Sequence, residues 1–137
     1  MKLTDAICKI EYSIAGEESY QMIDEDDNHD RNRLTFYPKS VIKLFDYLVE
    51  IDGREIELDE INVMLRYRVT FDFDSIDIVN EKCSYDVNVE FLSAYAFDVN
   101  ERGLAEHLNA QIEADIRDGR NIVIEEPTFK VILNTLR

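Results

Sequence analysis

The chain has 137 residues, 45% of them apolar, and its 30 acidic and 15 basic side chains give a formal charge of −15. This composition predicts a single globular domain over residues 1–137, with enough apolar side chains for a core. The acidic balance argues against nucleic-acid binding, which needs lysine and arginine to displace counterions. No apolar run is long enough to insert into a membrane.

The N-terminal residues and the cysteines bear on the compartment. The first residues lack the apolar core of a signal peptide. Two cysteines, Cys8 and Cys83, are too few for a disulfide framework. We therefore expect a cytoplasmic protein in which both thiols are reduced and half-buried.

The first predicted element is a strand over residues 5–14, in which Cys8, Ile10, Tyr12 and Ile14 fall on one side. The stretch from Glu17 to Asp30 holds seven acids and no base. Such a run predicts an exposed, mobile loop.

Four oxygen-bearing side chains in this loop have the spacing of the first ligands of a calcium site. That site also needs glycine at its sixth position and a bidentate glutamate at its twelfth, where this chain has His29 and Thr35. A solvated acidic loop is therefore the interpretation that we favour, and we expect no metal ion or cofactor. The four residues are Asp24, Asp26, Asn28 and Asp30.

The segment Pro38–Ile51 fits two patterns. Val41, Leu44, Phe45 and Leu48 fit a helical stripe, whereas alternate residues from Phe45 to Ile51 fit a strand. Asp-Gly between apolar runs is a strong hairpin signal. Because Asp52-Gly53 follows directly, we favour the strand.

The clearest pattern is the alternation of apolar and polar residues from Val63 to Phe73, which returns from Tyr85 to Phe91. It predicts two long, half-buried antiparallel strands, Val63–Ile78 and Lys82–Phe97. Near Leu92 the apolar phase is unclear, as expected for a β-bulge or a fully buried stretch.

Two helices are predicted after these strands. The first has Asp98 as its N-terminal cap, an apolar residue at every fourth position and an end at Gly119. The second follows Pro127 and has the i, i+3, i+4, i+7 spacing of a short amphipathic helix. Their apolar positions are Leu104, Leu108, Ile112 and Ile116 in the first, and Phe129, Ile132, Leu133 and Leu136 in the second. The predicted fold class is therefore α+β: an antiparallel sheet of about four strands with one long and one short helix packed on one side.

No pattern of residues predicts an enzyme. Asp72 and Asp74 could act as an acid–base pair, but with Arg66 and Arg68 they occupy the polar face of an amphipathic strand, where charges are expected. A Cys–His nucleophile would need His29 or His107 beside Cys8 or Cys83, and the sequence does not place them together.

From Val63 to Leu136 the chain resembles the SecB family of export chaperones. The first similarity is the strand Val-Met-Leu-Arg-Tyr-Arg-Val-Thr-Phe that starts at Val63. The second is a helix ending in Arg117-Asp-Gly-Arg, followed by an apolar piece and Pro127-Thr-Phe. The chain differs from the family at Asn100–Gly103, where proline and glycine are expected, and in its acidic loop.

The resemblance implies a four-stranded antiparallel sheet, homodimers or homotetramers, and grooves that hold non-native polypeptide. We therefore expect a non-enzymatic, SecB-like chaperone that binds unfolded or extended chains through apolar surface and strand edges. The alternative is an acidic inhibitor or immunity-type protein that docks on a basic partner enzyme. The residues that would contact a polypeptide cannot be named from the sequence.

Overall fold

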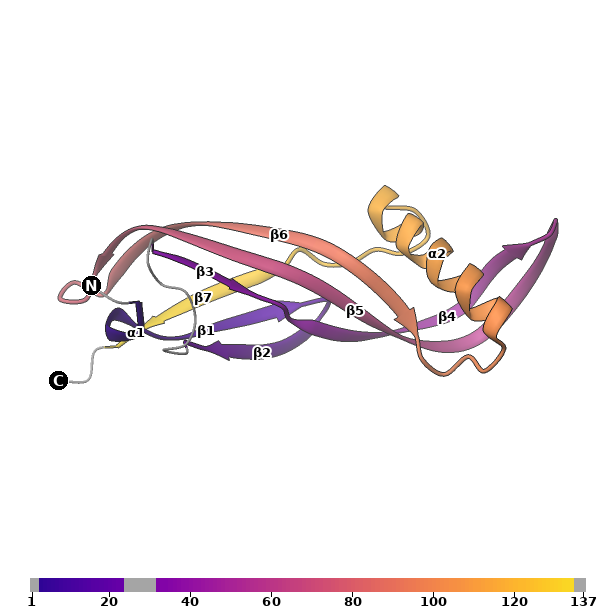
Figure 1. Ribbon diagram of the computed structural model, residues 1–137, viewed down its shortest axis with the longest axis horizontal. Coiled ribbons are helices and arrows are strands. Elements are labelled where there is room, and N and C mark those ends of the chain that lie inside the picture. Colours follow the sequence, from indigo (N-terminus) through magenta and orange to yellow (C-terminus); the bar gives the residue numbers. More distant parts are fainter. Residues whose placement is uncertain (1–2, 24–31, 135–137) are drawn as a thin grey trace. The chain divides into compact units, whose positions relative to one another are not determined.

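The computed structural model of the protein describes residues 3–23 and 32–134. These residues form mostly antiparallel β-structure (Figure 1). Among them, no helix is long and apolar enough to cross a membrane. The elements in chain order are α1 (Leu3–Ala6), β1 (Ile7–Ile14), β2 (Glu17–Met22), β3 (Arg33–Phe36), β4 (Lys39–Ile51), β5 (Arg54–Asp77), β6 (Lys82–Ala96), α2 (Arg102–Asp118) and β7 (Thr128–Leu133).

The predicted α+β class is wrong. In the described residues the strands form two sheets: one in the order β2-β1-β7, and one in which β5 pairs with β3, β4 and β6. Only α2 is a helix of more than one turn. The predicted C-terminal helix is instead strand β7, paired from Thr128 to Leu133 with β1. Phe129, Val131 and Leu133 also alternate, and pairing with β1 decides between the two patterns.

Part of the acidic stretch is also a strand, not a loop. Residues Glu17–Met22 form β2, which pairs with β1 from Ile14 to Lys9. Residues 24–31, where the rest of the predicted loop lies, are outside the described part of the chain.

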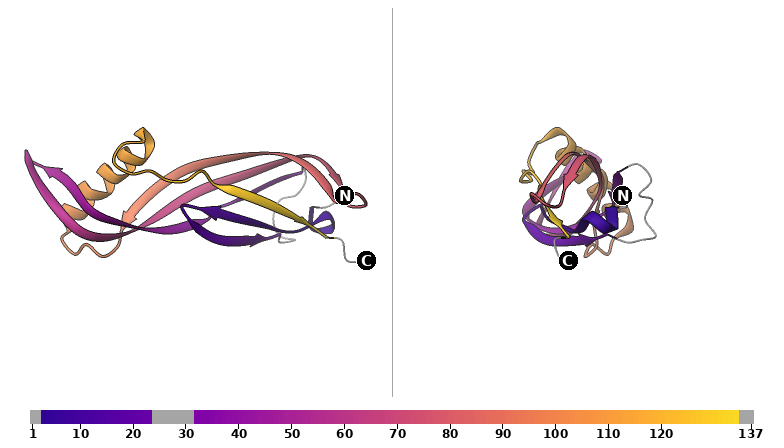
Figure 2. Two further views of the ribbon diagram at one scale, coloured as in Figure 1. Left: turned by 180° about the vertical axis from the view of Figure 1, so that it is seen from behind. Right: turned by 90° about the vertical axis from the view of Figure 1, so that its left-hand side faces the viewer.

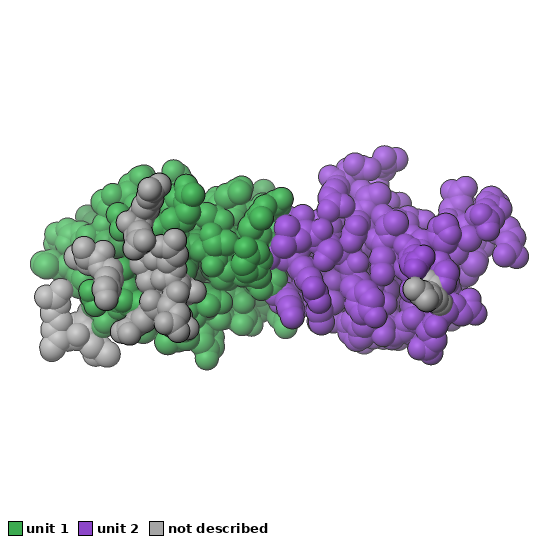
Figure 3. Space-filling view, in the orientation of Figure 1, with its two compact units in different colours: residues 1–38, 68–90, 126–137 green, residues 39–67, 91–125 purple. Residues whose placement is uncertain are grey.

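The chain divides into two compact units, which Figure 3 colours separately. Unit 1 comprises residues 1–38, 68–90 and 126–137, and unit 2 comprises residues 39–67 and 91–125. Strands β5 and β6 contribute residues to both units.

In unit 1 the two sheets lie on opposite sides (Figure 2), and apolar side chains from both are buried between them. The rings of Tyr12 and Phe36 join the sheets with centroids 5.5 Å apart, and Phe71 meets Phe129 edge-on at 5.3 Å. The fully buried side chains of this core are Leu3, Ile7, Ile10, Ile14, Leu34, Val69 and Phe71.

In unit 2 helix α2 covers one face of β4, β5 and β6. Its Leu108 and Ile112 are fully buried, as are Val63 and Leu65 of β5. The helix ends as predicted at Gly119, whose φ of 68° is the left-handed conformation that glycine adopts without strain. The predicted cap Asp98 does not cap α2, which begins after Glu101. It accepts hydrogen bonds from the backbone and side chain of Asn62 instead.

Side chains of α2 also cover the edges of the sheet in unit 2. Asn109 and Glu113 accept hydrogen bonds from the backbone N–H groups of Ala96 (2.8 Å) and Ala94 (3.0 Å) on β6. Arg117 donates to the carbonyl of Leu92 at 3.1 Å. The three helix residues are spaced four apart, so one stripe of α2 takes the place of a neighbouring strand.

Candidate polypeptide-binding cleft

The strand edges of unit 1 that lack a neighbouring strand in the described residues include those of β6 and β7. Within residues 3–23 and 32–134, β7 pairs only with β1, and β6 pairs only with β5. Each edge strand therefore presents backbone N–H and C=O groups that no neighbouring strand satisfies.

A cleft of about 730 Å³ lies between the two edges, within the range of roughly 300–1,000 Å³ that is usual for ligand sites. Five apolar or weakly polar side chains in it share an intermediate, half-buried exposure. Its lining consists of Ser75, Asp77, Glu81, Lys82, Cys83, Ser84, Tyr85, Phe129, Lys130, Val131 and Leu133. The half-buried ones are Cys83, Tyr85, Phe129, Val131 and Leu133.

An aromatic cluster joins the two edges beneath the cleft. The fully buried ring of Phe71 lies 5.0 Å from Tyr85 on β6 and 5.3 Å from Phe129 on β7. Phe73 adds a further contact with Tyr85 at 5.9 Å. Because β5 carries both phenylalanines, it forms the floor of the cleft, against which Tyr85 of β6 and Phe129 of β7 pack.

The charges that line the cleft are balanced, with Asp77 and Glu81 against Lys82 and Lys130. The pKa of Asp77 is lowered by hydrogen bonds from Asn80, which closes the turn before β6 at 2.7 Å. Burial raises the pKa of the Cys83 thiol, so this cysteine stays protonated at neutral pH. The cleft therefore favours an uncharged, apolar ligand over a strongly charged one.

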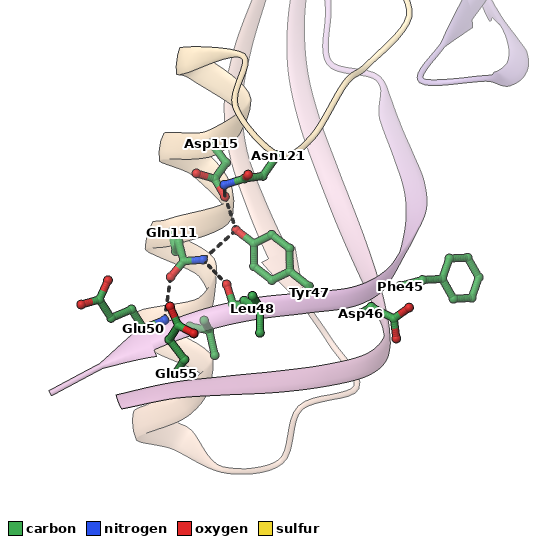
Figure 4. A pocket seen from close by; sticks show the side chains of 10 residues that line it. Phe45, Asp46, Tyr47, Leu48, Glu50, Glu55, Gln111, Asp115 and Asn121 are labelled. Atoms are coloured by element: carbon green, nitrogen blue, oxygen red, sulfur yellow. Dashed lines mark hydrogen bonds between the residues drawn. The ribbon is translucent and has the colours of Figure 1, made fainter. Parts of the chain in front are cut away.

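Unit 2 contains a second hollow, of about 550 Å³, beside β4 and α2 (Figure 4). Tyr47 points into it and donates a 2.5 Å hydrogen bond to Asp115. Gln111 donates to Tyr47 (3.1 Å) and to the carbonyl of Leu48 (2.6 Å), and accepts from the N–H of Glu50 (3.0 Å). These polar groups satisfy one another, so the network anchors α2 on the edge of β4.

Of the two aspartates considered as an acid–base pair, Asp72 takes part in a surface ion pair. Asp72 accepts a 2.7 Å hydrogen bond from Arg33, which joins β5 to β3. Arg68 pairs with Glu90 on β6. Asp74 and Arg66 are exposed. This arrangement is that of a solvated strand face.

The other sequence-based candidates have the following places. Asp24, Asp26, Asn28, Asp30 and His29 lie outside the described residues, and Thr35 faces Thr70 in the β3–β5 pair. Both cysteines are free thiols. Cys8 is exposed, contrary to the half-buried position expected, whereas Cys83 is half-buried as expected. His107 is exposed on α2 in unit 2, while both cysteines belong to unit 1.

Sequence reasoning missed one cluster of carboxylates. Asp46, Glu57 and Asp59 are exposed, and their oxygens lie within 4.8 Å of one another. The Asp52-Gly53 turn could have revealed it, because the hairpin register that follows from this turn sets Tyr47 against Leu58 and so brings their neighbours together. The cleft had no such signal, because it depends on β7 being a strand.

Comparisons with known proteins give no match: neither a family model, nor a curated protein, nor a solved structure is significantly similar to this chain. The resemblance to the SecB family stays a prediction.

Proposed function

We propose that this protein is a non-enzymatic binding protein that holds an extended, non-native polypeptide segment in the cleft between β6 and β7. The observation that carries the proposal is that the cleft lies between two strand edges, neither of which has a neighbour on that side in the described residues. An extended segment placed there can form backbone hydrogen bonds as an added strand, which is a common mode of peptide recognition.

The side chains that line the cleft support this choice of ligand. Alternate residues of β7, Phe129, Val131 and Leu133, are half-buried, and an added strand would remove them from water. Because the charges in the cleft balance, affinity would come from the backbone and from apolar contact. We propose the same holding role that the SecB-like resemblance implies, in a reducing compartment such as the cytoplasm.

The two cysteines provide a direct test on the native fold. In a Cys8→Ser variant, the rate of alkylation of Cys83 reports on the cleft. A reduced, alkylated model protein that cannot refold should slow this reaction several-fold at both low and high salt, because salt does not weaken apolar contact. In the matched Cys83→Ser variant, the exposed Cys8 should react at an unchanged rate.

A substitution in the cleft gives the second arm. Val131→Lys should remove the protection of Cys83 and the suppression of aggregation of the model protein. Val79→Lys, at an exposed position outside the cleft lining, should leave both intact. The proposal fails if Cys83 is not protected, or if the two lysine variants behave alike.

The runner-up is the docking of a basic protein. The observation that favours it is the lining of the hollow in unit 2, which includes Asp46, Glu50, Glu55 and Asp115 but neither lysine nor arginine. Such binding would weaken steeply with salt, because exposed charges are screened over about 8 Å at physiological ionic strength. Binding of a basic protein that is lost at high salt, with no protection of Cys83, would favour this function.

A further inference from the structure

The sheet in unit 2 has an outer face, opposite to the one on which Val63 and Leu65 are buried, that carries large apolar side chains in water. Their exposed fractions are 65% for Phe45, 53% for Tyr95, 46% for Phe97 and 45% for Val41. Monomeric proteins seldom leave a contiguous apolar patch of this kind exposed without a partner.

The register shows that these side chains are neighbours across three strands. Val41 of β4 lies opposite Met64 of β5. Phe97 follows directly after β6, and its N–H donates to the carbonyl of Asn62 on β5 at 3.3 Å. The apolar side chains therefore extend from β4 across β5 to the end of β6, with Asn62 and the Lys43–Glu60 pair among them.

The charges on this face separate into two ends. At one end, Lys39 of β4 lies directly opposite Arg66 of β5, and both are exposed. Two cations facing each other across a strand pair repel, which is unfavourable unless something else neutralises them. This basic end is unusual in a chain with a net charge of −15.

The other end is acidic. Beyond the pair Phe45–Glu60, the carboxylates of Asp46, Glu57 and Asp59 lie within 4.8 Å of one another. In the middle of the face, Lys43 is neutralised by Glu60 at 2.8 Å. The outer face thus has a basic end, a mainly apolar centre around the neutral Lys43–Glu60 pair, and an acidic end.

We propose that this face is the interface of a homodimer whose two-fold axis passes through its apolar centre. A two-fold axis that runs across the strands places the same patch on both copies in opposite directions. The basic end of each copy, Lys39 and Arg66, then meets the acidic end of the other, and the apolar centres bury each other. This single arrangement neutralises both clusters of like charge and covers the exposed aromatic rings.

A charge swap on the full-length chain tests this arrangement. Two variants each reverse the charge at one end of the face. The first carries Lys39→Glu and Arg66→Glu at the basic end, and the second carries Glu57→Lys and Asp59→Lys at the acidic end. In a dimer of either variant, like charges face each other at both contacts. Each should therefore weaken self-association by at least about tenfold relative to the native protein. Light scattering coupled to gel filtration, from low to high micromolar concentration, measures this.

Mixing the two variants gives the decisive result. In the mixed pair each contact again joins a cation to an anion, so a heterodimer should form at concentrations where either variant alone is monomeric. Asp5→Lys with Glu126→Lys, which makes the same change in net charge as Glu57→Lys with Asp59→Lys but on exposed positions of unit 1, should leave the native dimer unchanged.

Three outcomes would overturn the proposal: a native protein that is monomeric throughout the range, variants that dimerise as the native protein does, or a mixture that stays monomeric. Circular dichroism of each variant separates a lost interface from a lost fold. The result does not depend on the cleft in unit 1, so it can fail or succeed independently of the proposed function.

Discussion

Strand β6 has different surroundings in its two halves. In unit 2 its edge is covered by α2, whose Asn109, Glu113 and Arg117 hydrogen-bond to alternate backbone groups. In unit 1 no strand of the described residues lies on the same side, and the cleft opens there. The edge of β6 is thus covered by a helix in unit 2, and in unit 1 it is open to pairing with an added strand.

The opposite edge of the sheet in unit 2 is covered in the same way. Gln111 bonds both the carbonyl of Leu48 and the N–H of Glu50 on β4, so one helix covers two edges. Exposed edges invite pairing with other chains, and native proteins commonly cover them. Helix α2 thus covers part of both sheet edges in unit 2, whereas the edges of β6 and β7 beside the cleft in unit 1 have no such cover in the described residues, which supports the function proposed for the cleft.

The largest expected effect is at the floor of the cleft. Phe71→Ala should lower the free energy of unfolding by about 3–5 kcal/mol, because it removes a fully buried ring that packs against Tyr85 and Phe129. Urea unfolding followed by circular dichroism measures the loss. Phe71→Leu, which keeps most of the apolar volume, should lose less than half as much. Equal losses in the two variants would contradict the role given to the ring.

A smaller effect is expected where α2 is anchored on β4. Tyr47→Phe removes a hydrogen bond to the Asp115 carboxylate and should lower the free energy of unfolding by about 1.5–3 kcal/mol at neutral pH.

The effect of Tyr47→Phe should also depend on pH. Burial, and then the hydrogen bond to Asp115, raise the pKa of Tyr47 above its ordinary value of 10.0. The folded state then keeps a proton that the unfolded state loses, so the contribution of Tyr47 is complete below pH 10 and declines as the pH rises further. Urea unfolding at alkaline pH should show the difference between native protein and variant shrinking. A constant difference would mean that Tyr47 does not titrate as its surroundings require.

Covering the β4 edge should matter less for stability than for solubility. Gln111→Ala should lower the free energy of unfolding by only about 0.5–1.5 kcal/mol, because its bonds are largely exposed to water. It should nevertheless increase aggregation, since it uncovers backbone groups of Leu48 and Glu50. Turbidity at a fixed protein concentration measures this. His107→Ala, at an exposed position of the same helix, is the matched control and should change neither quantity.

The local parts of the fold could be predicted from the sequence. The alternation along β5 correctly predicted its buried face, because a strand with one dry side needs a two-residue period. Along β5, Val63, Leu65, Val69 and Phe71 are all fully buried. The Asp52-Gly53 hairpin and the end of α2 at Gly119 are likewise confirmed, since both depend on short-range turn geometry.

The cleft and the second sheet could not be predicted, because they depend on contacts between distant segments. Residues Thr128–Leu133 fit a helix as well as a strand, and only pairing with β1 decides between them. The acidic composition of Glu17–Met22 argued for a loop, yet the segment is an exposed strand whose backbone pairs with β1. Strand β6 is predicted correctly, but because Thr128–Leu133 is predicted to be a helix, the second rim of the cleft could not be recognised.

The smallest expected effect is at the ion pair between Arg33 and Asp72, which joins β3 to β5 on the outside of unit 1. Both side chains are about half exposed or more, and their atoms lie 2.7 Å apart. A double-mutant cycle with Arg33→Ala and Asp72→Ala should therefore give a coupling of only about 0.2–1 kcal/mol, decreasing with added salt. The four-residue strand β3 must then be held mainly by Leu34 and Phe36, which are buried in the core. A coupling well above this range, or one that salt does not change, would mean that surface charge holds β3 in place and that the apolar core of unit 1 contributes less than its burial indicates.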